Sequence, residues 1–311
     1  RFESCPGSQF LTPFPSSSVV HADELPVTAE SLDLGVASVV LLSAALHAVW
    51  NALVKVRGDQ VVTMTVVTTA GALVGLCAVP FLPLPLPAAW PFLGAALAAH
   101  LAFFLALARS YRVGDFSQAY PIARGANPLI VALVAFVVAG ERLTPTSLVG
   151  MGLVAGGIAA LAVSPGRRVD WRGVLAALLT AVTIAVSLVI DGLGVRKAGN
   201  PLSYLAWIFF LDFVPITLYS LRRYGRQGFV ERARPLVRFG LLGGLMNTTS
   251  YGIAIWAMSR APMSLVVALR ETNVVFGAAI GALLLREPLG GWRLAAAAVV
   301  AAGVVLIKLG G

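Results

Sequence analysis

Residues 117–143, SQAYPIARGANPLIVALVAFVVAGERL, recur 146 positions later as residues 263–289, MSLVVALRETNVVFGAAIGALLLREPL. In both copies an apolar helix carries an arginine and, three residues later, an asparagine, and an acidic turn and a second apolar helix follow. Five identical pairs share this offset, the last just beyond the stretch: Arg124 and Arg270, Asn127 and Asn273, Glu141 and Glu287, Leu143 and Leu289, Gly157 and Gly303. One offset for five pairs predicts an internal repeat.

The composition is that of a membrane protein. Of the 311 residues, 58% are hydrophobic and 12% are charged, whereas a soluble domain averages about 25% charged residues. The net charge of +9 comes from basic residues in short gaps between apolar segments, which is typical of cytoplasmic loops, so membrane lipid and not nucleic acid is the expected partner. Cys5 and Cys77 offer neither a disulfide framework nor metal-ligand spacing, and we expect no metal and no cofactor.

Apolar stretches of about the length that crosses a bilayer follow one another from Leu34 onward. We expect ten helices, at 34–55, 61–82, 88–109, 117–139, 145–164, 171–195, 201–221, 236–258, 264–285 and 291–309. The repeat then comprises five helices, with a first copy at 34–164 and a second at 165–311. Because five is odd, the second copy enters the membrane from the opposite side. The predicted fold is an all-α membrane protein of ten transmembrane helices in two inverted five-helix repeats.

The parts outside the helices give two further expectations. Residues 1–33 are rich in Ser, Pro and Thr and are predicted to be a disordered tail, and Arg1 in place of Met leaves a mis-called start open. The loops after odd-numbered helices hold fifteen Lys and Arg, and the alternate loops hold four. This asymmetry places the odd loops in the cytoplasm and both termini outside.

Glycines four residues apart let helix backbones approach closely. Four such pairs lie inside the expected helices: Gly71 and Gly75, Gly152 and Gly156, Gly240 and Gly244, Gly277 and Gly281.

Charged side chains inside a membrane usually face the bundle interior, because each costs about 2.5–3.5 kcal/mol at the bilayer centre on insertion scales. Arg124 and Arg270 lie about two turns inside their helices. An arginine fork can grip a substrate carboxylate or phosphate with two hydrogen bonds. The alternative is a structural ion pair with a carboxylate of the same interior, and the candidates for that pair are Glu271, Asp191 and Asp212.

The other intramembrane polar residues divide into two groups. Glu271 and His47 are candidates for coupling, because a buried carboxylate or imidazole can exchange a proton; a structural partnership remains the alternative for each. The substrate-binding candidates are Arg124, Asn127, Arg270, Asn273, Trp50, Asn51, His100, Asn247 and Tyr251. Asp191, Tyr204 and Asp212 belong to the same polar set, and none of them is assigned to substrate binding or coupling. Glu141 and Glu287 lie at helix ends, where we expect each to stabilise the N-terminus of the following helix.

Motifs of enzymes are absent from the sequence. It contains no G-x-x-x-x-G-K-[ST] loop and no H-E-x-x-H, G-x-S-x-G or paired C-x-x-C motif, so hydrolysis of ATP and the common metal and nucleophile chemistries are not expected. The chain is predicted not to be an enzyme. A membrane-embedded enzyme acting on lipid or isoprenoid substrates remains the alternative function.

Three segments carry a resemblance to a known family: LHAVWNALVK at 46–55, PIARG at 121–125 leading to GERL at 140–143, and its echo ALRETN at 268–273 leading to REPL at 286–289. Over residues 34–309 the chain resembles the EamA-type permeases of the drug/metabolite transporter superfamily. The resemblance implies a secondary active transporter in the bacterial inner membrane, an exporter or exchanger of small amino-acid-like or drug-like metabolites that works by alternating access. A homodimer is a further expectation.

Overall fold

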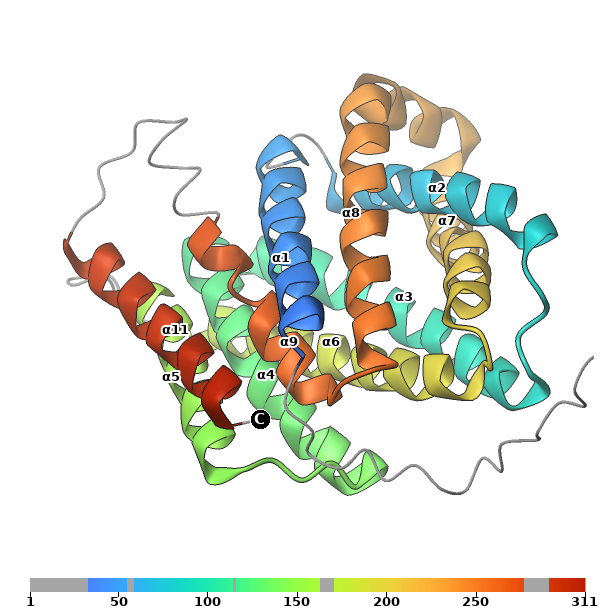
Figure 1. Cartoon of the computed structure of the whole chain (residues 1–311). Helices are drawn as coiled ribbons and strands as arrows, with labels where there is room; N and C mark the ends of the chain where they lie inside the picture. The colour runs from blue at the N-terminus through green and yellow to red at the C-terminus, as the bar shows by residue number, and fades with distance from the viewer. Residues whose placement is uncertain (1–32, 55–58, 114–115, 163–170, 277–290, 311) are drawn as a thin grey trace, which may run out of the picture.

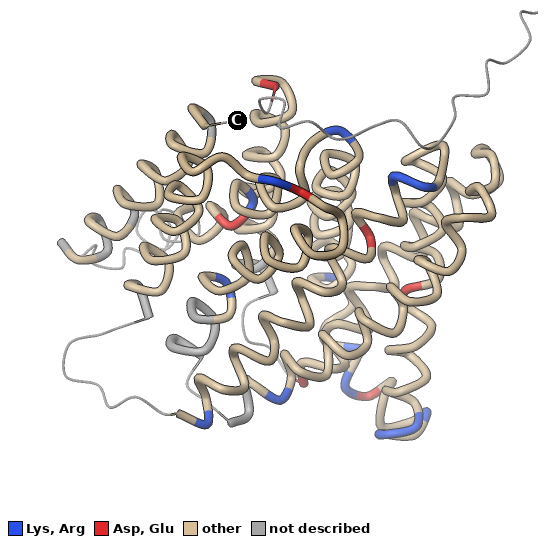
Figure 2. Tube along the Cα trace, turned by 90° about the horizontal axis from the view of Figure 1, so that it is seen from below, with Lys and Arg blue, Asp and Glu red and all other residues tan. Residues whose placement is uncertain are grey.

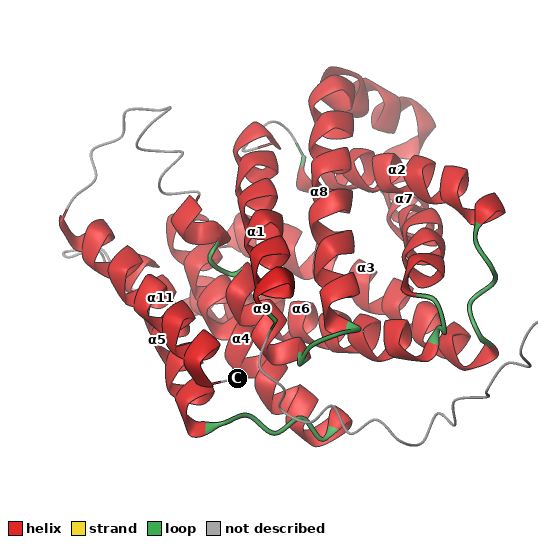
Figure 3. Cartoon of the chain, viewed as in Figure 1, coloured by secondary structure: helices red, strands yellow, loops and turns green. Residues whose placement is uncertain are grey.

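The computed structural model describes residues 33–54, 59–113, 116–162, 171–276 and 291–310, and their chain is helical with short turns and no strand (Figure 3). Some side chains inside these helices, including those of 51–54, 111–113 and 116–122, are outside the described set. Residues 1–32 of the predicted tail at 1–33 also lie outside the described residues. In the described part the predicted all-α class is confirmed.

The helices fall close to the predicted stretches. Apolar runs of about 20 residues favour helix, because only a helix satisfies its own backbone hydrogen bonds in lipid. The α-helices are α1 Leu34–Val54, α2 Gln60–Ala78, α3 Trp90–Val113, α4 Phe116–Ala139, α5 Pro145–Ala162, α6 Trp171–Lys197, α7 Pro201–Ala233, α8 Val237–Met258, α9 Met263–Arg270 and α11 Gly291–Gly310. Short 3-10 turns are η1 Val79–Phe81, η2 Pro87–Ala89 and η3 Arg234–Leu236.

Two helices differ from their predicted lengths. α7 was expected to end at 221, but it continues to Ala233, with a break at Gly225, whose φ of 67° lies in the left-handed region that glycine tolerates. α9 was expected to reach 285, but it ends at Arg270, and a turn over Glu271 and Thr272 follows. The Thr272 hydroxyl donates to the carbonyl of Leu269 at 2.7 Å, a local bond that competes with continued helix. Residues 277–285 of the predicted helix lie outside the described residues.

Four described stretches are long and apolar enough to cross a membrane: Gln60–Phe81, Pro87–Ser110, Trp171–Lys197 and Pro201–Met258. The last of these includes both α7 and α8. Shorter apolar helices occur at Leu34–Trp50, Ala123–Ala139, Pro145–Ala160 and Ala298–Ile307. The chain is therefore a multi-pass membrane protein.

Helices from the two halves of the chain pack against each other (Figure 1). α5 lies along α11 at one side of the molecule, and α2 lies along α7 at the other, with α1, α4, α6 and α9 between them. α1 packs on α8, where Ser43 and Ser250 each donate to the other's carbonyl oxygen, at 2.7 and 2.8 Å. α3 packs on α6. The interior of the bundle is thus an interface between the two halves.

Glycines allow several of these contacts. A Cβ on Gly150 would lie 2.7 Å from the carbonyl oxygen of Gly303, so the backbones of α5 and α11 touch there. Gly75 and Gly244 are equally confined, against the backbones of α7 and α2. The predicted pair Gly152 and Gly156 instead has nothing within 4 Å of either Cβ position, so close packing by that pair is wrong: these two residues lie on an exposed face of α5. Gly277 and Gly281 lie outside the described residues.

Asp59 caps α2 and joins it to α7. Its carboxylate accepts hydrogen bonds from the amides of Val61 and Val62 at 2.9 and 3.4 Å, and from the Tyr224 hydroxyl. Partial burial alone would raise the pKa of this carboxyl, but the hydrogen bonds from Tyr224 and the two amides outweigh it and lower the pKa overall. The cap therefore holds a charged carboxylate at the helix N-terminus.

Glu141 connects the two halves at the start of α9. Its carboxylate accepts from the Met263 amide at 2.8 Å, from the Ser264 hydroxyl at 3.1 Å and from the Arg196 guanidinium at 3.0 Å. Arg196 also donates to the carbonyl of Met258. The predicted structural role of Glu141 fits these contacts, but the helix it caps is α9 and not the following α5, because the bundle folds the α9 N-terminus onto the 140–144 turn. Glu287 lies outside the described residues.

The glycine contact gives a matched pair of substitutions on α5. Gly150→Val should destabilise the protein by about 1–3 kcal/mol, because the new side chain meets the α11 backbone. Gly152→Val should have little effect, since its side chain enters open space. Apparent unfolding temperatures of the two variants in detergent check this, and equal temperatures would contradict the packing.

The capping contact predicts the effect of Glu141→Gln, which keeps the shape of the side chain but removes its charge. We expect a loss of about 1.5–3 kcal/mol, because hydrogen bonds to a charged group contribute about that much. Glu231→Gln is the control, since Glu231 is exposed and bonds to Gln227 within its own helix. If the control lowers the unfolding temperature as much as Glu141→Gln does, the loss of stability is not specific to the capping contact of Glu141.

Candidate functional site

Charged residues lie within the helix packing of this protein as well as at its helix ends (Figure 2). Many of the buried ones gather in two groups. The arginine cluster consists of Trp50 and His47 on α1, Arg124 and Asn127 on α4, and Arg270, Glu271 and Asn273 at the end of α9. The histidine cluster consists of His100 on α3, Asp191 on α6, Tyr204 and Asp212 on α7, and Tyr251 on α8. Each cluster joins helices of both halves.

His47 is the centre of the arginine cluster. The guanidinium of Arg124 lies 3.0 Å from His47 Nε2, and that of Arg270 lies 3.1 Å from His47 Nδ1, the nitrogen to which the Trp50 indole also donates at 3.0 Å. A neutral imidazole has one acceptor nitrogen, and arginine offers only donors. A neutral His47 ring can therefore accept a hydrogen bond at only one of its two nitrogens at a time. Arg124 and Arg270, which face different nitrogens, compete to donate to it.

Glu271 pairs with the first-half residues of the cluster. Its Oε1 accepts from Arg124 Nη1 at 3.3 Å and from Asn127 Nδ2 at 2.8 Å. All three residues are buried, with Asn127 and Glu271 at most 1% exposed. Of the three carboxylates considered as ion-pair partners for the arginines, the structure shows Glu271 with Arg124, and it places Asp191 and Asp212 in the other cluster.

Several polar atoms of the arginine cluster have no hydrogen-bond partner. Within the described part of the chain these include Glu271 Oε2, Asn127 Oδ1 and Asn273 Nδ2. A buried polar group without a partner costs about 1–3 kcal/mol. Such atoms are therefore unusual in folded proteins, and here they indicate a candidate binding site. Two of these atoms, Glu271 Oε2 and Asn127 Oδ1, are acceptors, and Asn273 Nδ2 is a donor.

The break after Arg270 positions the second-half groups of this cluster. Glu271 is the C-terminal cap of α9, and its amide bonds back to the carbonyls of Leu269 and Val267. Interrupted helices of this kind form substrate and ion sites in transporters, because their ends present backbone and side-chain polar groups in the middle of the membrane.

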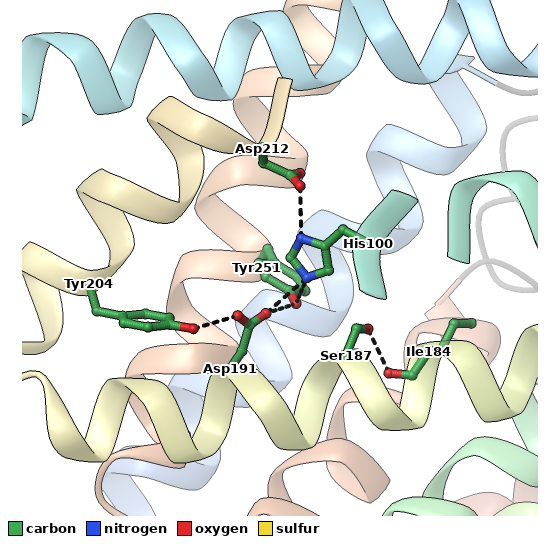
Figure 4. Close-up of polar contacts among 7 residues, drawn as sticks. All are labelled: His100, Ile184, Ser187, Asp191, Tyr204, Asp212 and Tyr251. Carbon is green, nitrogen blue, oxygen red and sulfur yellow. Dashed lines mark hydrogen bonds and ion pairs between the residues drawn. The ribbon is translucent and has the colours of Figure 1, made fainter. Parts of the chain in front are cut away.

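His100 lies between two carboxylates in the histidine cluster (Figure 4). Its Nε2 is 3.0 Å from Asp191 Oδ2, and its Nδ1 is 2.9 Å from Asp212 Oδ1. Asp191 is fully buried and also accepts from the hydroxyls of Tyr204 and Tyr251, at 2.8 and 2.6 Å. Asp212 is less buried, with 16% of its side chain exposed.

Tyr251 connects the clusters, because the guanidinium carbon of Arg270 lies 5.5 Å from the centre of its ring. A cation over an aromatic face is stabilised by the ring's electrons. Most of the candidates identified in the sequence thus meet in one of the two clusters. Asn247 is partly buried and has no hydrogen-bond partner among the described residues, and the side chain of Asn51 lies outside the described set.

The sequence did not assign Asp191, Asp212 and Tyr204 to a site. The sequence did show each of them as a polar residue in an apolar helix. It could not show that they meet His100, which is 91 positions from Asp191 and 112 from Asp212. Only the packing of α3 against α6 and α7 shows that they meet. No group of three or more His, Cys, Asp or Glu that could hold a metal ion occurs in the described ranges.

Comparisons with known proteins agree with the fold. One solved crystal structure, described only as that of a protein, aligns with this chain with a TM-score of 0.71 and 17% sequence identity. The alignment covers 88% of this chain and 98% of the other. At this identity the likeness shows the fold alone. No curated protein matches the chain. The model of the EamA-like transporter family matches residues 171–309. Residues 171–309 are thus similar to the EamA-like transporter family, in agreement with the resemblance seen in the sequence.

Proposed function

We propose that this membrane transporter of small molecules is a secondary active transporter of amino-acid-like or drug-like metabolites, acting in export or exchange by alternating access in the bacterial inner membrane. The observation that carries the proposal is the arginine cluster. Two guanidinium groups and one carboxylate lie buried together between the halves, beside polar atoms that lack partners among the described residues. Buried charge at this density is costly in a membrane and is typical of a substrate pathway.

The helix packing supports an inverted repeat of five plus five helices. If α1 corresponds to α6 and α3 to α8, the contact of α1 with α8 is the same contact as that of α6 with α3, with the halves exchanged. Corresponding helices also meet each other: α2 meets α7, α4 meets α9 and α5 meets α11. A two-fold axis in the membrane plane between the halves produces this pattern, and transporters with that symmetry bind substrate at the repeat interface.

The cluster fits a substrate that carries both an anionic and a cationic group. Arg124 and Arg270 would grip a carboxylate, because guanidinium forks match its two oxygens. The free Glu271 Oε2 and Asn127 Oδ1 are acceptors that suit an ammonium group. Asn273 Nδ2 adds a donor. An α-amino acid presents these two charges a few ångströms apart.

Glu271 and His47 would couple substrate binding to movement. Without substrate, Glu271 pairs with Arg124, and His47 lies between the two guanidinium groups. A substrate carboxylate that takes the arginines must displace these contacts. Since Arg124 and Glu271 lie in different halves, the exchange of partners changes what holds the halves together.

The alternative, a membrane enzyme, is not favoured, because the family model that matches residues 171–309 is that of transporters. A homodimer remains a prediction without a structural test.

The experiment is counterflow in proteoliposomes against a panel of labelled amino acids, other metabolites and drugs. Wild-type protein should exchange at least one of them. Arg124→Gln and Arg270→Gln should each raise the apparent KM roughly 10- to 150-fold or abolish exchange, because a charged hydrogen bond contributes about 1.5–3 kcal/mol. Arg226→Gln, at an exposed position on α7, is the control for charge alone.

Folding of each variant is checked by size-exclusion chromatography and thermal unfolding before transport is compared. Wild-type kinetics in both arginine variants would disprove the gripping role. Movement of the labelled compounds that is the same in empty liposomes would disprove transport itself.

A further inference from the structure

The histidine cluster assembles one residue of the first half with four of the second. His100 on α3 contacts Asp191 on α6, Asp212 on α7 and Tyr251 on α8, and the Tyr204 hydroxyl on α7 reaches Asp191 (Figure 4). Among the described residues, the only further charge that faces this group is Arg270, over the ring of Tyr251. The proposed grip on the substrate leaves these carboxylates without a role.

The contacts determine where hydrogen atoms must lie. The Tyr251 hydroxyl donates to Asp191 Oδ2 at 2.6 Å, so its hydrogen is not available for His100. His100 Nε2 therefore faces two acceptors, the Tyr251 oxygen at 3.2 Å and Asp191 Oδ2 at 3.0 Å. A hydrogen must therefore lie between Nε2 and Asp191 Oδ2, because two lone pairs do not attract each other at such distances, and the imidazole carries it as the stronger base.

The other ring nitrogen then requires a second proton. His100 Nδ1 lies 2.9 Å from Asp212 Oδ1. A neutral ring with its hydrogen on Nε2 would present a lone pair there to a carboxylate oxygen. The contact is attractive only if one more proton lies between the two atoms, and the imidazole, as the stronger base, carries it on Nδ1. The geometry is thus that of a cluster that has taken up a proton.

From this count we propose that His100 and Asp212, supported by Asp191, form the site of the proton that drives transport. The inference rests on the proposed function and names its coupling ion. The proton binds between His100 Nδ1 and Asp212 Oδ1 and leaves on the side of Asp212, whose side chain is partly exposed, whereas Asp191 is fully buried. Release leaves a neutral His100 and a charged Asp212, whose facing lone pairs repel.

Proton release would loosen α7 at a weak point of the helix. Pro215 lies inside α7, one turn after Asp212. Proline has no amide hydrogen and removes one bond of the helix ladder, which favours bending at the preceding turn. Asp191 keeps its two tyrosine donors after release, so α6 stays attached to α7 and α8 while the contact between α3 and Asp212 opens.

The proton site has a direct route to the substrate site. The Tyr251 hydroxyl binds Asp191, and the Tyr251 ring lies under Arg270. A substrate that draws Arg270 away from the ring changes the position of a residue that holds Asp191 and His100. This single side chain can therefore make proton release depend on substrate binding.

The first test observes the proton without any substrate. The chain has three histidines, at positions 21, 47 and 100, so the full chain with ¹⁵N-labelled histidine in lipid nanodiscs gives few ring signals, assigned with single variants. At neutral pH, Asp212→Asn should convert the His100 ring from doubly to singly protonated, because the amide can donate to Nδ1. Ser187→Ala should leave it unchanged, since Ser187 bonds only to the Ile184 carbonyl on its own helix. A His100 ring with one bare nitrogen in the wild type, beside a charged Asp212, would overturn the proposal.

The second test measures coupling in proteoliposomes, with a compound that the wild type exchanges. An imposed pH gradient should drive net accumulation by the wild type and by Ser187→Ala, and this effect of the gradient should be lost in Asp212→Asn and His100→Gln. If the gradient still drives accumulation in a folded Asp212→Asn variant, the proton binds elsewhere although transport itself stands. If the wild type exchanges no compound, the proposed transport function fails, and the histidine spectra still decide whether the proton site exists.

Discussion

The cost of a charge in an apolar bundle governs this structure. Arg124 and Glu271 are both buried, and each would be strongly unfavourable alone at this depth. Their ion pair, at 3.3 Å, joins α4 of the first half to the end of α9 in the second. The same requirement holds for His100 between Asp191 and Asp212. Charges that must be paired inside the membrane therefore specify which helices of the two halves meet.

The two similar stretches of sequence differ in the residue that follows each arginine, Gly125 after Arg124 and Glu271 after Arg270. Gly125 follows Arg124 where α4 lies close to α5, because a Cβ there would be 2.9 Å from the Ala155 carbonyl. The equivalent position after Arg270 holds Glu271. A large side chain fits there because α9 ends at this point and the chain turns. Two similar sequences thus bring two arginines but only one carboxylate into the centre.

The sequence predicted those features that depend on local pattern. Apolar length located the helices, and the shared offset identified Arg124, Asn127, Arg270 and Asn273, which are all buried. Features that depend on packing were not predictable. The spacing of Gly152 and Gly156 was right for close contact, but that face of α5 is turned outward. The pairing of His100 with Asp212 depends on how α3 crosses α7, for which one sequence carries no signal.

α9 is attached to the half of the molecule to which it does not belong by sequence. Its first residues bind Glu141 of the first half, and the residue after its end binds Arg124 and Asn127, also of the first half. The eight residues of α9 are thus held at both ends by the first half of the chain. Under the proposed alternating access, the moving bodies would then not coincide with the two halves of the sequence. α9 would move with the first half unless both attachments break, and the boundary between the moving parts would run through the chain on either side of α9.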